Sequence, residues 1–345
     1  MTDVTDDATH EAERIDARLP IFGRRVRPAP RRTPVRGGHA VTCTGTVPSV
    51  ARTSVTRPPS TKGAKDALGV LSRPGPNPVK YGDLGLIGLP GIVYTPAEGY
   101  QLPAVVVGHA WLQPAHRYHE LLRHLATWGF VAAAPNTQRG PVPSIAQFAS
   151  DLNTVLDVCV GVRLGDGHVS VDARKTALVG HGTGGGAAVL AAARRERLGA
   201  LVTLAASEVQ PSAIEAAATV TVPTLHLAAA VDSLAPMEGH AQRIAAAGHE
   251  AGTDVTLREI EKAGHLGFCE GRHWTSFLLQ NRPQHRTRKI TRALVTAFLM
   301  QELQNEKRVS SLTSGNVPGA PLVDLTPQPD DEQDQQPSGL LGIGG

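Results

Sequence analysis

The sequence predicts an α/β fold in which a mostly parallel central sheet is covered by helices on both faces. Short, continuous apolar runs, typical of strands buried on both faces, alternate with segments whose apolar residues recur every three or four positions. A glycine-rich strand–turn–helix segment, Leu178–Ala188, lies in the middle of this alternation. Alternation of this kind favours a single parallel sheet.

The first part of the predicted sheet comes from three apolar segments. Gly91–Pro96 is predicted to be a strand that ends at Pro96, because proline has no N–H to donate to a neighbouring strand. Leu102–Gly108 and Phe130–Ala134 are continuous apolar runs of the buried type. Between them, apolar residues at helical spacing in Tyr118–Leu125 predict a helix, which Gly129 ends.

The middle of the chain predicts two more helices and the strand between them. Ser144 and Gln147 form a capping box, which favours a helix start. The apolar stripe of that helix consists of Ile145, Phe148, Leu152, Val155, Leu156 and Cys159. Thr176–Val179 and Gly184–Arg194 are then the strand and helix on either side of the glycine-rich turn.

The last part continues the same alternation. Leu201–Ala205, Pro223–Ala229 and Asp254–Ile260 are predicted strands, and Met237–Ala247 is a predicted helix. An amphipathic helix ending at Leu303 closes the domain near residue 305.

We expect three regions: an arm at 1–67, a folded domain at 68–305 and a tail at 306–345. Both ends lack sustained apolar periodicity, so both are predicted to be disordered. The arm contains a run of bases without acids, namely Arg24, Arg25, Arg27, Arg31, Arg32 and Arg36. The tail after Arg308 contains acids without bases, namely Asp324, Asp330, Asp331, Glu332 and Asp334.

Composition excludes several classes of protein. Apolar residues make up 41% of the chain, enough for a full core, but no apolar run reaches the roughly 18 residues of a membrane span. The arginine run has no interleaved aromatic residues and no nucleic-acid-binding module beside it, so nucleic acid is not an expected partner. Three cysteines without metal or disulfide spacing, and no visible secretory signal, predict a cytoplasmic protein.

The glycine-rich segment has the form of a nucleophile elbow, the Gly-x-Ser-x-Gly turn that presents a serine above a sheet. Gly180 and Gly184 occupy the two flanking positions, and Gly182 stands where serine belongs. If Thr183 were the nucleophile, His181 would fill a position that needs a small residue. A β-branched residue is also disfavoured at the positive φ of such a turn. Gly182 is therefore the predicted nucleophile position, without a nucleophile.

Asp232 and His265 follow the turn in the order acid, then base, that such sites use. Each lies just after a predicted strand, and sites in parallel sheets gather at the carboxyl ends of strands. Either residue alone is compatible with an ordinary loop position. Their joint order and placement predict a catalytic acid and a catalytic base.

Backbone N–H groups are expected to form an oxyanion hole at the same place. One donor would be Thr183, and the other would come from the turn Gly108–Trp111, so that His109, Ala110 and Trp111 line the cleft. Packing of Trp111 under its loop is the alternative. No metal is expected, although His109, His181 and His265 could be drawn as ligands. Neither a phosphate-binding loop nor a dinucleotide fingerprint indicates a cofactor.

Several motifs resemble the dienelactone-hydrolase and polyester-hydrolysing cutinase branch of the α/β-hydrolase superfamily. They are Ser72–Pro76, Leu125–Phe130, Val171–Arg174, Gly180–Gly186, Val222–Leu225 and Val231–Pro236. The resemblance covers the chain from about Arg73 to Leu303. It implies an α/β-hydrolase fold and a carboxylic-ester hydrolase ancestry, but that family carries Ser or Cys where this chain has Gly182.

Three hypotheses of function follow. The first is a catalytically impaired pseudo-hydrolase that binds a small acyl or ester-like ligand. The second is an active ester or lactone hydrolase in which His265 and Asp232 activate water; a Cys269 nucleophile is disfavoured, because no elbow presents it. The third is a partner-docking protein that acts through its charged arms. The sequence leaves the oligomeric state open.

Overall fold

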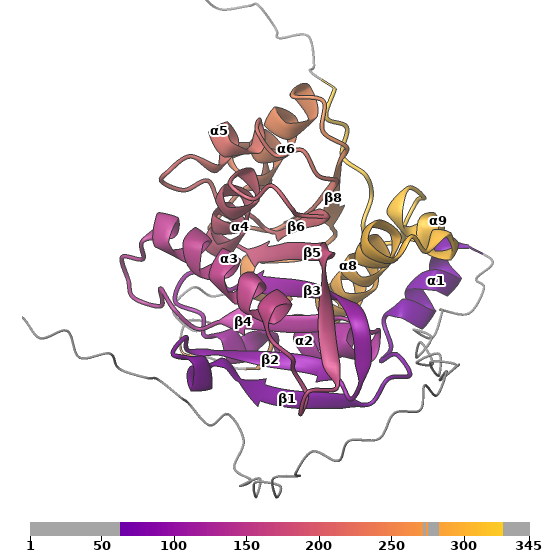
Figure 1. Cartoon of the computed structure of the whole chain (residues 1–345). Helices are drawn as coiled ribbons and strands as arrows, with labels where there is room; N and C mark the ends of the chain where they lie inside the picture. The colour runs from indigo at the N-terminus through magenta and orange to yellow at the C-terminus, as the bar shows by residue number, and fades with distance from the viewer. Residues whose placement is uncertain (1–62, 272–273, 275–282, 327–345) are drawn as a thin grey trace, which may run out of the picture. The chain divides into compact units, whose positions relative to one another are not determined.

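A computed structural model describes residues 63–271, 274 and 283–326 of the chain (Figure 1). Residues 1–62 of the predicted basic arm and residues 327–345 of the predicted acidic tail lie outside the described residues. The strands of the described part are β1 (Val79–Asp83), β2 (Gly91–Pro96), β3 (Gly99–Gly108), β4 (Val131–Pro135), β5 (Val169–His181), β6 (Ala200–Leu204), β7 (Thr224–Ala229) and β8 (Val255–Ile260).

These strands form one sheet in the order β1-β2-β4-β3-β5-β6-β7-β8. The strands from β4 to β8 are parallel, whereas β1 pairs antiparallel with β2, and β2 with β4. The predicted α/β fold with a mostly parallel sheet is confirmed. Strand β1 was not predicted, because it is a largely exposed edge strand without an apolar run.

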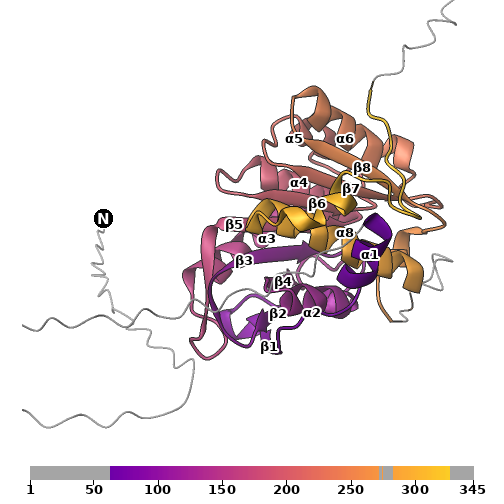
Figure 2. The same ribbon diagram turned by 90° about the vertical axis from the view of Figure 1, so that its right-hand side faces the viewer.

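Helices cover both faces of the sheet (Figure 2). They are α1 (Ala64–Leu71), α2 (His119–Thr127), α3 (Ile145–Gly161), α4 (Thr183–Ala193), α5 (Ala213–Ala217), α6 (Ala241–Glu250), α8 (His285–Gln304) and α9 (Ser310–Thr313). Helices α3 to α6 pack on one face, and α1, α2 and α8 on the other. No helix in the described ranges is both long and apolar enough to cross a membrane.

Successive side chains of the central strands point to opposite faces of the sheet and so contribute to the two halves of the core. In β3, Ala104 and Val106 pack with α3 and α4, while Val105 and Val107 pack with α2 and α8. A strand with apolar residues on both faces reads as a continuous apolar run, which explains why such runs located the central strands. Half of the predicted capping box forms: the Ser144 hydroxyl accepts the N–H of Gln147 at 3.3 Å, but the Gln147 side chain donates to Asp151 and the Ser144 N–H donates to Gln138 instead.

The folded region extends beyond both predicted limits of the domain. Helix α1 begins at Ala64, before residue 68, and the chain after residue 305 continues through η5 (Lys307–Val309) and α9 to Thr326. This last segment, residues 306–326, is called the C-terminal strap below. Its buried side chains are Val309, Leu312, Val317 and Ala320. They lack a helical or alternating period, so the sequence pattern did not reveal that the strap packs on the domain.

The buried Arg258 of β8 holds the strap in place. Its two terminal nitrogens donate to four backbone carbonyls, those of Leu312, Thr313, Gly315 and Ala320. The strap also bonds to the edge of β8, where the Val323 N–H donates to the Leu257 carbonyl at 2.9 Å. The strap therefore covers a sheet edge that would otherwise be open.

Candidate active site

The turn between β5 and α4 has its unusual backbone geometry at Gly182. This residue has φ 56° and ψ −121°, a conformation that side-chain-bearing residues rarely adopt. Its N–H donates to the Leu204 carbonyl at 3.0 Å, and its carbonyl accepts the N–H groups of Gly185 and Ser207. Thr183 is the first residue of α4 and is not among the positive-φ residues. The apex of the turn is therefore Gly182.

Close packing requires the glycines on either side of this apex. A Cβ on Gly180 would lie 2.1 Å from the Gly184 carbonyl oxygen, and a Cβ on Gly184 would lie 2.4 Å from the His109 carbonyl oxygen. Backbone atoms cannot yield at such distances. This explains physically why the sequence pattern places glycine two positions before and two positions after Gly182.

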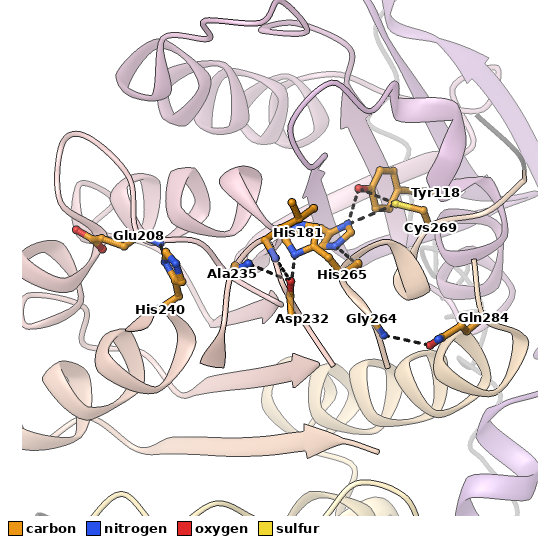
Figure 3. Close-up of polar contacts among 11 residues, drawn as sticks. Tyr118, His181, Glu208, Asp232, Ala235, His240, Gly264, His265, Cys269 and Gln284 are labelled. Carbon is orange, nitrogen blue, oxygen red and sulfur yellow. Dashed lines mark hydrogen bonds and ion pairs between the residues drawn. The ribbon is translucent and has the colours of Figure 1, made fainter. Parts of the chain in front are cut away.

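Asp232 and His265 contact each other through their side chains (Figure 3), and His265 lies beside Gly182. They come from the loops after β7 and β8, and His265 Nδ1 lies 2.7 Å from Asp232 Oδ2. The other carboxylate oxygen accepts the N–H groups of Leu234 and Ala235, at 2.9 and 3.0 Å. The two side chains are 6% and 1% exposed, His265 first. Because the carboxylate requires a donor, Nδ1 carries the proton, and Nε2 keeps a free electron pair.

The free nitrogen of His265 points to the side-chain position of Gly182. A Cβ built on Gly182 would lie 2.8 Å from His265 Nε2 and 3.2 Å from Ala110 Cβ. Because 2.8 Å is shorter than real Cβ contacts, a side chain at residue 182 would require a small shift of the His265 ring, and a hydroxyl there would lie next to Nε2. The structure brings together three of the predicted site residues, Gly182, Asp232 and His265.

Gln284, the residue before α8, supports the loop that carries His265. The backbone N–H of Gly264 donates to the Gln284 side-chain oxygen at 3.3 Å. The backbone N–H of Gln284 donates to the Gly267 carbonyl at 3.2 Å. These bonds, drawn in part in Figure 3, fix both ends of the short helix η4 (His265–Phe268). The position of His265 is therefore set by the frame around it as well as by Asp232.

Of the residues predicted to line the cleft from the β3 loop, His109 is buried instead, whereas Ala110 lies beside Gly182 and Trp111 is exposed. The His109 ring is buried against Phe148, and its Nε2 is 2.7 Å from the Thr137 carbonyl, which requires it to donate. Burial lowers the pKa of His109, so the ring is neutral. Trp111 is 37% exposed and donates from Nε1 to the Pro141 carbonyl. Packing under the loop is thus not the role of Trp111.

Of the predicted oxyanion donors, Ala110 already has an acceptor. Its N–H donates to the Tyr118 hydroxyl at 3.0 Å. The Thr183 N–H is one of the first four of α4, which cannot find acceptors within their own helix. The oxyanion role of Thr183 therefore stays a prediction, whereas the Ala110 N–H serves the internal network described next.

Sequence reasoning missed a buried network centred on Tyr118. The Tyr118 hydroxyl lies 2.7 Å from His181 Nδ1, and His181 Nε2 lies 2.9 Å from the His265 carbonyl. Since a carbonyl accepts, Nε2 carries the proton of His181, and Tyr118 donates to Nδ1. The chain of bonds runs from Ala110 through Tyr118 and His181 to the backbone of His265. No spacing in the sequence signals it, because its members lie far apart along the chain.

Cys269, the alternative nucleophile, and His181, a conceivable metal ligand, both contact Tyr118 in this buried network. Cys269 Sγ lies 3.6 Å from both the Tyr118 hydroxyl and His181 Nδ1, and burial raises the pKa of its thiol to about 11. Burial lowers the pKa of His181 well below its usual range. Within the described ranges, no three or more His, Cys, Asp and Glu side chains are grouped as metal ligands.

Known proteins match the part of the chain that contains this site. The family model described as PET hydrolase-like matches residues 85–273, which is more than half of the chain and includes Gly182, Asp232 and His265. The chain belongs to this family. The predicted resemblance to polyester-hydrolysing cutinases is thereby confirmed at the level of the family.

A curated relative of this PET hydrolase-like chain is cutinase est1 of Thermobifida alba. The two are 26% identical over 176 residues, which cover 51% of this chain and 57% of the relative. The chain thus spans a little over half the length of that relative.

Proposed function

We propose that this PET hydrolase-like protein is a catalytically impaired hydrolase whose site binds an acyl or ester-like ligand. The observation that carries the proposal is the position of His265 Nε2, 2.8 Å from where a Cβ of Gly182 would lie. An oriented base thus faces the apex of the turn, and the apex has no hydroxyl or thiol. Gly182 accordingly occupies the place of the family's nucleophile.

The neighbouring side chains do not replace the missing group. Thr183 begins α4, one residue beyond the apex, and Cys269 is a buried thiol whose raised pKa disfavours the reactive thiolate. An oxyanion hole and ligand binding alone retain roughly 10³–10⁴-fold catalysis over water. This is far below the activity of a complete site.

Apolar side chains at the same edge of the sheet favour an apolar acyl ligand. Val231 and Leu234, on either side of Asp232, are 66% and 40% exposed, and Trp111 on the β3 loop is also exposed. Exposed apolar groups that gather beside a polar site are typical of ligand-binding surfaces.

The intact Asp232–His265 pair favours a second candidate, in which His265 Nε2 activates a water molecule directly. A pure binding protein has no need of an oriented base at this position. General-base assistance contributes roughly 10²–10⁴-fold, so such an enzyme would turn over slowly unless its substrate were reactive.

Hydrolysis of p-nitrophenyl acetate separates the two candidates. For the impaired site, we expect wild-type turnover near background and a gain of about 10²-fold or more in Gly182→Ser, on the scale of general-base assistance. The gain should vanish when His265→Ala is added. Substantial wild-type turnover that His265→Ala abolishes would overturn the first candidate in favour of the second. Absence of any gain in Gly182→Ser would contradict the placement of Gly182 at the nucleophile position.

A further inference from the structure

A second polar pocket lies away from Gly182, between α1, α2 and α8 and beside β2. Its volume is about 360 Å³, and its lining includes Arg123, His124, Arg292, Tyr94 and Ser72. None of Gly182, Asp232 and His265 lines it. The charged residues that line this pocket are therefore not part of the candidate active site.

Positive charge exceeds negative charge around this pocket. Arg292 Nη1 lies 2.9 Å and Arg288 Nη1 lies 3.1 Å from the same oxygen of Glu120. Arg123 adds a third guanidinium, and it is exposed. The other nearby acid is Glu270, whose pKa is raised by burial to about 7, so it carries only part of a charge at neutral pH. The pocket lining thus holds two guanidinium groups, Arg123 and Arg292, against one carboxylate, Glu120, which Arg288 also contacts.

One buried donor of the pocket lining lacks an acceptor. Arg292 Nε is buried and has no hydrogen-bond partner among the described residues, and the same holds for Nε of Arg288, which lies outside the lining and shares Glu120 with Arg292. His124 bonds to the Leu71 backbone through its other ring nitrogen, so its buried Nε2 is an acceptor and not a donor. Burial, followed by the charge of Arg292, lowers the pKa of His124 to about 3, so its ring is neutral. Buried polar atoms in folded proteins are ordinarily hydrogen-bonded, so a buried donor without an acceptor calls for an explanation, of which a bound ion or water is one.

We propose that this pocket binds the oxyanion of a small molecule, a carboxylate or a phosphate group. Guanidinium groups recognise such anions through paired, charge-assisted N–H···O bonds, which matches the excess of arginine here. Arg123 and Arg292 supply the charge from two different helices, α2 and α8. The bound anion balances the positive charge of the arginines that Glu120 alone does not neutralise.

Titration calorimetry at constant ionic strength tests this site, with inorganic phosphate and acetate as separate probes. We expect saturable binding of at least one probe. The exposed Arg123→Gln should weaken it by about 10-fold or more, the effect of one lost charge-assisted hydrogen bond. The matched control is Arg243→Gln, a change at an exposed arginine on α6 outside the pocket, and it should leave the affinity unchanged.

The two probes identify the class of ligand, since preference for phosphate or acetate distinguishes a phosphorylated ligand from a carboxylic acid. Arg292→Lys provides a second test, because it keeps the charge beside Glu120 and removes the Nε–H donor. It should weaken binding while circular dichroism shows a retained fold. Lack of saturable binding by both probes, an unchanged affinity in Arg123→Gln, or equal weakening in Arg243→Gln would overturn the proposal.

Discussion

At the scale of single residues, the site depends on two features that meet at one point. Gly182 adopts a backbone conformation that excludes most side chains, and Nε2 of His265 lies next to the place where a side chain would begin. Asp232 fixes the tautomer and the orientation of that ring through its 2.7 Å contact. Under the proposed function, the chemistry available is that of a general base without a covalent partner.

Tyr118 makes a prediction at the same scale. Tyr118→Phe removes the acceptor of the buried Ala110 N–H and the donor to His181 Nδ1. An unsatisfied buried polar group costs about 1–3 kcal/mol, so the free energy of unfolding in urea should fall by at least that amount. Tyr81→Phe is the matched control, since Tyr81 is 59% exposed, and it should change stability little. Equal stability of the two variants would contradict the role of the network.

At the scale of elements, the β5–α4 turn depends on close packing of backbone atoms, whereas the C-terminal strap depends on hydrogen bonds from a side chain. The turn requires glycine because backbone atoms approach within van der Waals distance of Gly180 and Gly184. The strap instead depends on one long side chain, Arg258, whose guanidinium binds the carbonyls of a segment far along the chain. Burial lowers the pKa of Arg258 to about 10, which leaves it charged at neutral pH.

Truncation tests the strap. Removal of residues 306–345 takes away the four carbonyls that Arg258 binds and opens the edge of β8. A buried charge without its partners costs about 3–5 kcal/mol, so we expect a loss of stability of that order in urea unfolding. Removal of residues 327–345 is the control, because the strap and its contacts stay. The strap would have no structural role if both truncations unfolded at the same urea concentration.

At the scale of the whole molecule, one buried carboxyl makes stability depend on pH. Glu270 accepts the N–H groups of Glu120 and Leu121 at the start of α2, which favours its charged form. Burial has the larger effect and raises its pKa from 4.5 to about 7. Its contribution to stability is complete below about pH 4.5. It is lost as the pH rises through 7, because the unfolded carboxyl ionises first.

Glu270→Gln tests this dependence. The variant cannot ionise at residue 270, so the free energy of unfolding of the wild type, relative to the variant, should fall by about 3 kcal/mol between pH 4.5 and 8. Urea unfolding at a series of pH values measures the difference. Glu250→Gln, at an exposed position of α6, is the control and should show a smaller change. A constant difference between wild type and Glu270→Gln would contradict the shifted pKa.

The sequence predicted the central sheet and the meeting of Asp232 with His265, because apolar runs and strand order determine both. It missed β1, whose residues are mostly exposed, and the strap, whose anchors are backbone carbonyls without a sequence signature. It misplaced the His109 ring, since a loop histidine turns inward as readily as outward. The bond between Tyr118 and His181 depends on tertiary structure alone and could not be predicted.

The central claim is that Gly182 is a nucleophile position that retains its base. The most direct measurement is covalent labelling with a fluorophosphonate, followed by peptide mass mapping. We predict one adduct per chain on the side chain introduced by Gly182→Ser, lost when His265→Ala is added, and no adduct on this peptide in the wild type. An unlabelled Gly182→Ser, or a wild-type adduct at Thr183 or Cys269, would contradict the account.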